Sequence, residues 1–312
     1  MDYIKFIVLV LHVFLFYGCN KVDNFENVEV IRFEKEFYDS DDKNLDSVIN
    51  KYPFLFPNQF SRSIWIEKKS DSTEIGLYQK SLEVFDDFQF NSPKLKLIFK
   101  NAKENFNSFQ APKLISLISL GDYNDKVIYA DSIVLVSLNY YYGSSYYPDL
   151  PKYLSRKMDK SYIFNDIAHE ISKSFIKKNE DRTLLSEMIY KGKIFYINKT
   201  LNPYESDMII FNSTENKIKW ASLNELEIWT YFLENELFYN TDIDLRSRFL
   251  SLSPYSKFNL DIDRLSPGNI GSWLGYKIVS SYVNKNNISL DELINLDHYT
   301  IFKNSKYKPP KK

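Results

Sequence analysis

The segment Ile167-Ala168-His169-Glu170-Ile171-Ser172-Lys173 constrains this chain more than any other part of it. A helix that holds zinc for peptide hydrolysis carries two histidines four residues apart, because this spacing places both imidazoles on one face. His169 and Glu170 stand in the order of a metal ligand and a general base, but Lys173 occupies the position of the second imidazole. A charged ammonium has no lone pair to give to a metal. The segment therefore predicts a catalytic helix that lacks a ligand.

The remaining metal ligands would have to come from distant parts of the chain. Beyond the first 18 residues, His298 is the only other histidine, and the position expected for a ligand on the following helix holds Lys191. Two lysines at ligand positions repel a dication. We therefore expect neither zinc nor catalysis, with His169 and Glu170 as relics and with Lys173 and Lys191 bridging the helices across the vacated site. An unusual zinc site formed by His169, Glu187 and His298 is the alternative.

The N-terminus predicts a lipid anchor. Lys5 precedes an apolar run over residues 6–16, and Cys19, the only cysteine, follows Gly18. The run has the length of a signal-peptide core and is short for a bilayer span. We interpret residues 1–18 as a lipoprotein signal peptide, Cys19 as the acylated residue and residues 19–27 as a tether. The mature protein would then face the periplasm from a membrane; an uncleaved anchor is the alternative.

The remainder, residues 28–312, shows no break in composition and predicts one domain of α+β class. Alternation predicts strands near residues 28–33, 113–120, 127–131 and 132–138, and the short spacing of the last three favours an antiparallel set. Helical periodicity appears near residues 42–51, 80–88, 93–106, 164–175 and 184–198, from residue 224 and from residue 267. We therefore expect a β-rich first half with a short sheet and a helical second half.

The net charge argues against nucleic-acid binding, and the placement of the glycines argues against a phosphate-binding loop. The formal net charge of -1 lacks the basic excess that binding to a phosphate backbone needs. Gly268, Gly271 and Gly275 recur at helical spacing, but they follow no predicted strand and lack the lysine ending of a phosphate-binding loop. We expect all three to lie on one helix stripe that another backbone approaches closely, which would offset their poor helix propensity.

Taken in order, several segments resemble the GldB family of gliding-motility lipoproteins. The resemblance rests on five segments: Val30-Ile31-Arg32-Phe33-Glu34, Tyr129-Ala130-Asp131 with Leu138-Asn139-Tyr140-Tyr141, Ala168-His169-Glu170-Ile171, Met188-Ile189-Tyr190-Lys191-Gly192-Lys193, and residues 267–279. It implies a lipid-anchored envelope protein of Bacteroidota that works with gliding-machinery proteins and the associated type IX secretion system. The family is itself similar to zincin-like peptidases, which implies a zincin-like fold.

The resemblance assigns His169 as a ligand and Glu170 as the general base, and Lys173 and Lys191 depart from that pattern. The expected function is therefore non-catalytic, as a pseudo-peptidase that acts through protein–protein contacts. Two alternatives stay open, a zinc metallopeptidase with the unusual ligand set and a purely structural scaffold lipoprotein. An enzyme requires a metal, a peptide-binding module requires an open groove beside an unpaired strand edge, and a scaffold requires neither.

Overall fold

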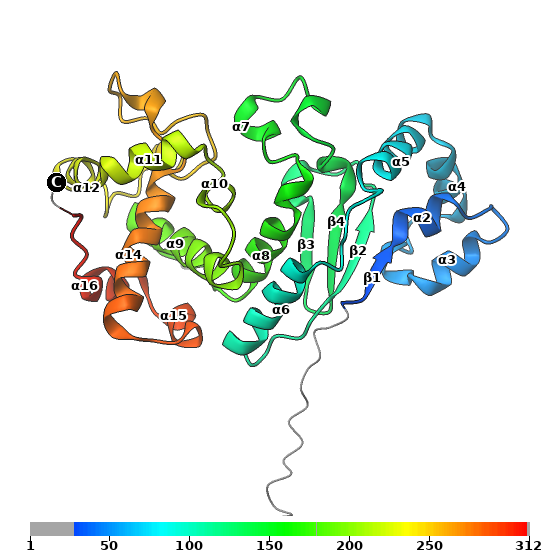
Figure 1. The fold of residues 1–312 in the computed structure, drawn as a ribbon, viewed down its shortest axis with the longest axis horizontal. Helices are drawn as coiled ribbons and strands as arrows, with labels where there is room; N and C mark the ends of the chain where they lie inside the picture. Colours follow the sequence, from blue (N-terminus) through cyan, green and yellow to red (C-terminus); the bar gives the residue numbers. More distant parts are fainter. Residues whose placement is uncertain (1–27, 179, 311–312) are drawn as a thin grey trace, which may run out of the picture.

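The computed structural model describes residues 28–310 apart from residue 179, so the predicted signal peptide, Cys19 and the tether lie outside the described residues. A four-stranded sheet lies near the middle of the molecule in the order β1-β2-β4-β3 (Figure 1). Its strands are β1 (Val30–Arg32), β2 (Lys113–Leu117), β3 (Val127–Ala130) and β4 (Ile133–Ser137). β1, β2 and β4 run parallel, and β3 pairs antiparallel with β4 at the outer edge.

Two predictions about this sheet are wrong. The expected antiparallel set is limited to the hairpin of β3 and β4, because β4 inserts between β2 and β3 and pairs parallel with β2. Alternation reveals which residues share a face but not the direction of the neighbouring strand. The first half is also not β-rich, since each strand has only three to five residues. Helix accounts for about 57% of this mixed α/β structure.

Helices fill most of the first half instead. They are α2 (Phe33–Tyr38), α3 (Leu45–Lys51), α4 (Arg62–Ser70), α5 (Ser72–Val84) and α6 (Pro93–Asn105). α6 starts where the sequence predicts it, with Pro93 in the first turn and the Ser92 side chain accepting from the Leu95 N–H. A small separate core forms beyond β1 from Phe37, Leu45, Val48, Tyr52 and Phe56.

The second half is helical, as predicted. Its helices are α7 (Lys152–Ser155), α8 (Ile163–Ser174), α9 (Leu184–Leu201), α10 (Asp207–Ile210), α11 (Glu215–Leu223), α12 (Glu225–Glu234), α13 (Ile243–Phe249), α14 (Ile270–Asn286), α15 (Leu290–Asn295) and α16 (His298–Ser305). One continuous core joins them to the sheet, with buried members from Val28 to Tyr307. Within the described part of the chain, no helix combines the length and apolar character needed to cross a bilayer.

Close helix packing explains two of the three spaced glycines. A Cβ added to Gly275 on α14 would lie 2.0 Å from the carbonyl oxygen of Met188 on α9. On the facing helix, a Cβ added to Gly192 of α9 would lie 2.4 Å from the Gly275 carbonyl carbon. A Cβ on Gly271 would lie 3.0 Å from the Phe249 carbonyl oxygen. Gly268 does not belong to this stripe, because it precedes the helix and lies against the backbone of Ser253.

Candidate functional site

The His169-Glu170 segment forms α8, beside the edge strand β3 (Figure 1). Ile167, Ala168 and Ile171 are fully buried, so the predicted apolar face of this helix packs on the core. His169 and Glu170 are only partly buried, because they lie on the side of α8 that borders a hollow. The helix is therefore placed by its apolar residues, and the two polar residues are presented to one cavity.

This hollow has a volume of about 170 Å³. Its walls come from the start of β3 and the segment before it, from the loop after α7, from α8 and from the turn after α10. The lining residues are Asn124, Lys126, Val127, Lys157, Asn165, Asp166, His169, Glu170 and Asn212. Polar side chains dominate this list, so we call the cavity the His169 hollow and treat it as the candidate site.

A buried ion pair lines the His169 hollow. The Lys126 ammonium lies 2.7 Å from Oδ2 of Asp166, and the Tyr141 hydroxyl donates to the same oxygen at 2.8 Å. Lys126 also donates to the carbonyl oxygen of Lys157 and lies 4.3 Å from the centre of the Tyr141 ring. Burial would raise the pKa of Asp166, but the ammonium groups of Lys126 and Lys157 and these hydrogen bonds hold it below its usual value.

His169 is held neutral in this setting. Burial is the main cause that lowers the pKa of its imidazole to about 4; the positive charges of Lys157, Lys191 and Lys173 act in the same direction, and Asp166 opposes them. The ring packs beside Phe195, with 6.1 Å between centroids. No residue in the described part of the chain forms a hydrogen bond with the imidazole.

Lys173 and Lys191, which stand where zinc ligands would be expected, do not line the His169 hollow. Lys173 pairs with Glu170 at 2.9 Å on the same helix, and its side chain is 51% exposed. This pair cannot join α8 to α9, so the expected bridge between the helices is wrong for Lys173. Lys191 on α9 is half-buried, and burial lowers its pKa although Glu187 acts in the opposite direction. Both ammonium charges still act on His169 from outside the cavity.

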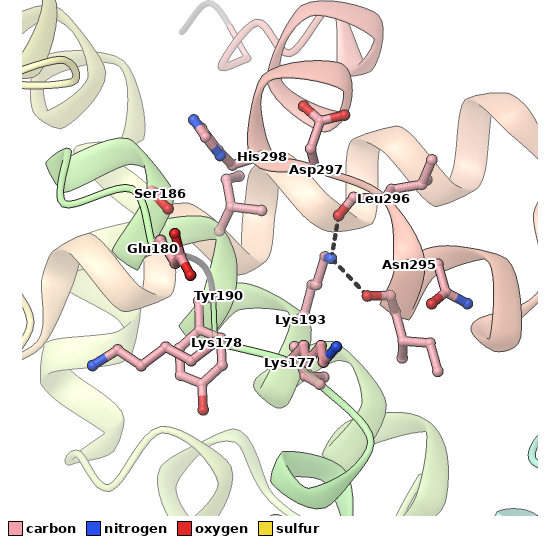
Figure 2. A pocket seen from close by; sticks show the side chains of 13 residues that line it. Lys177, Lys178, Glu180, Ser186, Tyr190, Lys193, Asn295, Leu296, Asp297 and His298 are labelled. Carbon is pink, nitrogen blue, oxygen red and sulfur yellow. Dashed lines mark hydrogen bonds between the residues drawn. The ribbon is translucent and has the colours of Figure 1, made fainter.

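Glu187 and His298 have their own charged partners, and neither residue lines the His169 hollow. Glu187 contacts the Arg246 guanidinium at 3.2 Å and the Lys178 ammonium at 3.9 Å. His298 lies 3.0 Å from Asp181, at a second pocket formed by the loop after α8, by α9 and by the α15–α16 connection (Figure 2). In residues 28–310 without residue 179, no group of three His, Cys, Asp or Glu residues is placed to hold a metal ion.

Figure 2 also shows how this second pocket is built. Lys193, which is buried, donates from its ammonium to the carbonyl oxygens of Leu296 at 2.6 Å and Ile294 at 3.2 Å. Burial lowers the pKa of Lys193 to about 8. These bonds tie α9 to the end of α15, which indicates a structural role for the second lysine of the Lys191-Gly192-Lys193 segment.

Sequence reasoning missed most of the His169 hollow. Asp166 is three residues before His169, so the spacing along α8 was sufficient to place both on one face. Lys126, Lys157 and Asn212 come from separate segments, and no local pattern connects them to α8. The buried Lys126–Asp166 pair is therefore a feature that only the folded chain reveals.

The fold and the site together define a class: a mixed α/β domain with a small, mostly parallel sheet whose antiparallel edge strand borders a polar cavity. The chain matches the family described as gliding motility protein GldB over residues 19–309. It therefore belongs to the GldB gliding-motility family, as the sequence resemblance predicted. Comparison with curated proteins and with solved structures gave no match.

Proposed function

We propose that this protein is a lipid-anchored component of the cell envelope of a bacterium of the Bacteroidota. In this proposal it serves the gliding and type IX secretion machinery, and it acts by binding another protein rather than by catalysis. Membership of the GldB family supports the link to gliding motility. The signal-like N-terminus supports the anchor, since Cys19 follows an apolar run and is also the first residue of the family match. We propose a zincin-like ancestry for the domain on the basis of the His169-Glu170 helix.

The ion pair between Glu170 and Lys173 is the observation that carries the non-catalytic proposal. A general base in a zinc peptidase must reach a metal-bound water, and the metal needs a second imidazole four residues after the first. Here the residue at that position is a cation that binds the would-be base. The positive charges around His169 further disfavour a dication at this position.

The outer edge of β3 offers a means of binding a partner. The Ser137 N–H donates to the Lys126 carbonyl at 2.8 Å, so residues 126, 128 and 130 direct their backbone groups toward β4. The N–H and C=O groups of Val127 and Tyr129 therefore face outward, and no backbone partner for them exists among the described residues. An extended segment could pair with this edge as an added strand, directly beside the His169 hollow.

Genetic complementation separates catalysis from binding. Glu170→Gln removes the carboxylate that hydrolysis would require and keeps the shape of the side chain. We expect full rescue of a deletion strain by this variant, measured as gliding or as secretion of a type IX substrate. Failure of rescue at normal protein level would contradict the non-catalytic proposal and would favour the peptidase alternative.

A matched pair of variants tests the edge. Tyr129→Pro removes an outward N–H without taking a hydrogen bond from the β3–β4 ladder, as is tolerated on edge strands. Tyr129→Thr removes the ring and keeps the N–H. We expect only the proline variant to lose rescue, with both proteins folded by circular dichroism. Rescue by the folded proline variant would exclude strand addition at this edge and would favour a scaffold role.

A further inference from the structure

A row of aliphatic side chains crosses the whole sheet on the face opposite the main core. Leu114 of β2 and Val134 of β4 belong to that core, so the residues next to them along each strand point to the other face. There Ile115 is the cross-strand partner of Leu135, and the outer strands extend the row in both directions. This aliphatic row consists of Ile31, Ile115, Leu135 and Ile128, one residue from each strand.

The aliphatic row ends in solvent at the edge strand β3. Ile115 in the middle of the row is fully buried, whereas Ile128 at its end is 47% exposed. Ala130, the next residue of β3 on the same face, is also exposed. A mostly parallel sheet is normally covered on both faces. The exposed end of a continuous aliphatic row therefore indicates a layer that is incomplete at β3.

A groove confirms that this face is open beside the row. Its volume is about 890 Å³, and its apolar lining comes from the sheet and from the segment after α3: Ile31, Ile115, Ala130, Ile133, Tyr52 and Phe54. At the β1 end, Ile31 packs against the small core beyond that strand. The face is therefore covered at β1 and becomes open toward β3, which is also the edge with outward-facing backbone groups.

A strand added to β3 would supply the missing neighbour of Ile128. The backbone groups of Ile128 point to β4, so an antiparallel strand at the outer edge would meet this residue in a non-hydrogen-bonded pair. The Cα atoms of such a pair are only about 4.5 Å apart, and the two side chains touch. The adjacent residues of the added strand would lie on the other face, with Val127 and Tyr129.

We propose that the partner segment carries a branched aliphatic or aromatic side chain opposite Ile128, which becomes the next member of the aliphatic row. This inference rests on the proposed addition of a strand to β3, and it states the chemistry of the added segment. Backbone bonds at Val127 and Tyr129 would accept any extended chain, whereas the side-chain contact selects among chains. The selective contribution comes from the apolar surface of Ile128 that leaves water on binding.

The test is selection from a displayed library of random peptides set between constant linkers. The reference target is the chain from residue 19 with Cys19→Ser, and the two variants add Ile128→Thr or Ile64→Thr to it. Threonine keeps the branched Cβ that suits a strand. Ile64 on α4 is 43% exposed and is a matched control outside the sheet.

We expect one peptide position enriched in apolar residues on the reference and on Ile64→Thr, and no such preference on Ile128→Thr. Equal enrichment on all three targets would overturn the role of Ile128.

Disulfide mapping measures the pairing directly. Cys19 is the only cysteine of the chain, so Ile128→Cys in the Cys19→Ser protein introduces a single thiol. Selected peptides carry one cysteine, placed at the enriched position or at either neighbour. We expect disulfide formation about tenfold faster at the enriched position, because the neighbours point to the other face of the sheet. Equal rates at the three positions would overturn the pairing with Ile128.

Two failures can be distinguished. If no peptide is enriched on the folded reference protein, or if the enriched peptides bind Tyr129→Pro equally well, strand addition itself fails and the proposed function fails with it. If Tyr129→Pro abolishes binding but no apolar position depends on Ile128, strand addition stands and the inference about the aliphatic row is overturned.

Discussion

The ammonium of Lys126 lies 2.7 Å from the carboxylate of Asp166, and both side chains are nearly excluded from solvent. Lys126 precedes the edge strand and Asp166 lies on α8, so this pair connects the two elements that flank the candidate site. The Tyr141 hydroxyl, which also donates to Asp166, adds the segment after β4 to the same network. The cavity is thus framed by a charged contact rather than by apolar packing alone.

Breaking this pair should destabilise the fold strongly. Asp166→Asn leaves a buried ammonium without its counter-ion, and Lys126→Met leaves a buried carboxylate, so each should lower the free energy of unfolding by about 3 kcal/mol or more. The double variant leaves neither charge uncompensated and should cost clearly less than the sum. Urea denaturation at neutral pH measures all four proteins. Additive losses would contradict the coupling between the two residues.

Replacing a glycine by alanine should change the free energy of unfolding in opposite directions at two sites, one in the contact between α9 and α14 and one on α5. Gly275→Ala places a Cβ 2.0 Å from the Met188 carbonyl oxygen, which should cost about 3 kcal/mol through forced separation of the helices. Gly76→Ala on α5 meets no atom within 4 Å and should gain up to about 1 kcal/mol from helix propensity. Thermal unfolding of both variants provides the comparison. A Gly275→Ala protein as stable as the wild type would refute the close packing.

Stability should fall with acidification in a window set by His169. Its folded-state pKa of about 4 lies below the ordinary value of 6.5, so the unfolded chain binds this proton first. Above pH 6.5 the neutral ring makes its full contribution to the free energy of unfolding, and this contribution is lost as the pH falls toward 4. The loss should reach about 2 kcal/mol after allowance for the ring's partial exposure.

His169→Gln removes this titration and provides the control. The difference between the unfolding free energies of the two proteins should change between pH 6.5 and 4 and stay constant above that range. Asp166, whose pKa lies below 3.8, loses its contribution at lower pH still and does not enter the window. A pH-independent difference would mean that His169 is not held neutral in the folded protein.

The anchor makes a separate prediction about location. Cys19→Ser removes the thiol that acylation requires, so the variant should neither incorporate labelled palmitate nor remain with membranes after fractionation. Lys5→Ser, which leaves the cysteine in place, is the control for changes in the leader. Retention of the Cys19→Ser protein in the membrane fraction would indicate an uncleaved apolar anchor instead.

Particular residues show how far the sequence could predict this structure. Periodicity located α8 and α9 because their buried positions recur along a single helix. It could not order the strands, since parallel pairing of β2 with β4 depends on contacts outside both segments. Likewise, His169 and Glu170 could be proposed as site residues from a local motif. Lys157 and Asn212 could not, because only the folded chain brings their segments to α8.

Residues near the C-terminus pack into the main core. Tyr307 donates from its hydroxyl to the buried carboxylate of Glu225, and Ile301 on α16 is fully buried in the main core. At the other end, β1 pairs with a strand more than 80 residues later. A chain with such non-local contacts folds slowly, because distant segments must meet before they are stabilised. If the protein is exported in the unfolded state, its native fold can therefore be completed only after residue 307 has crossed the membrane.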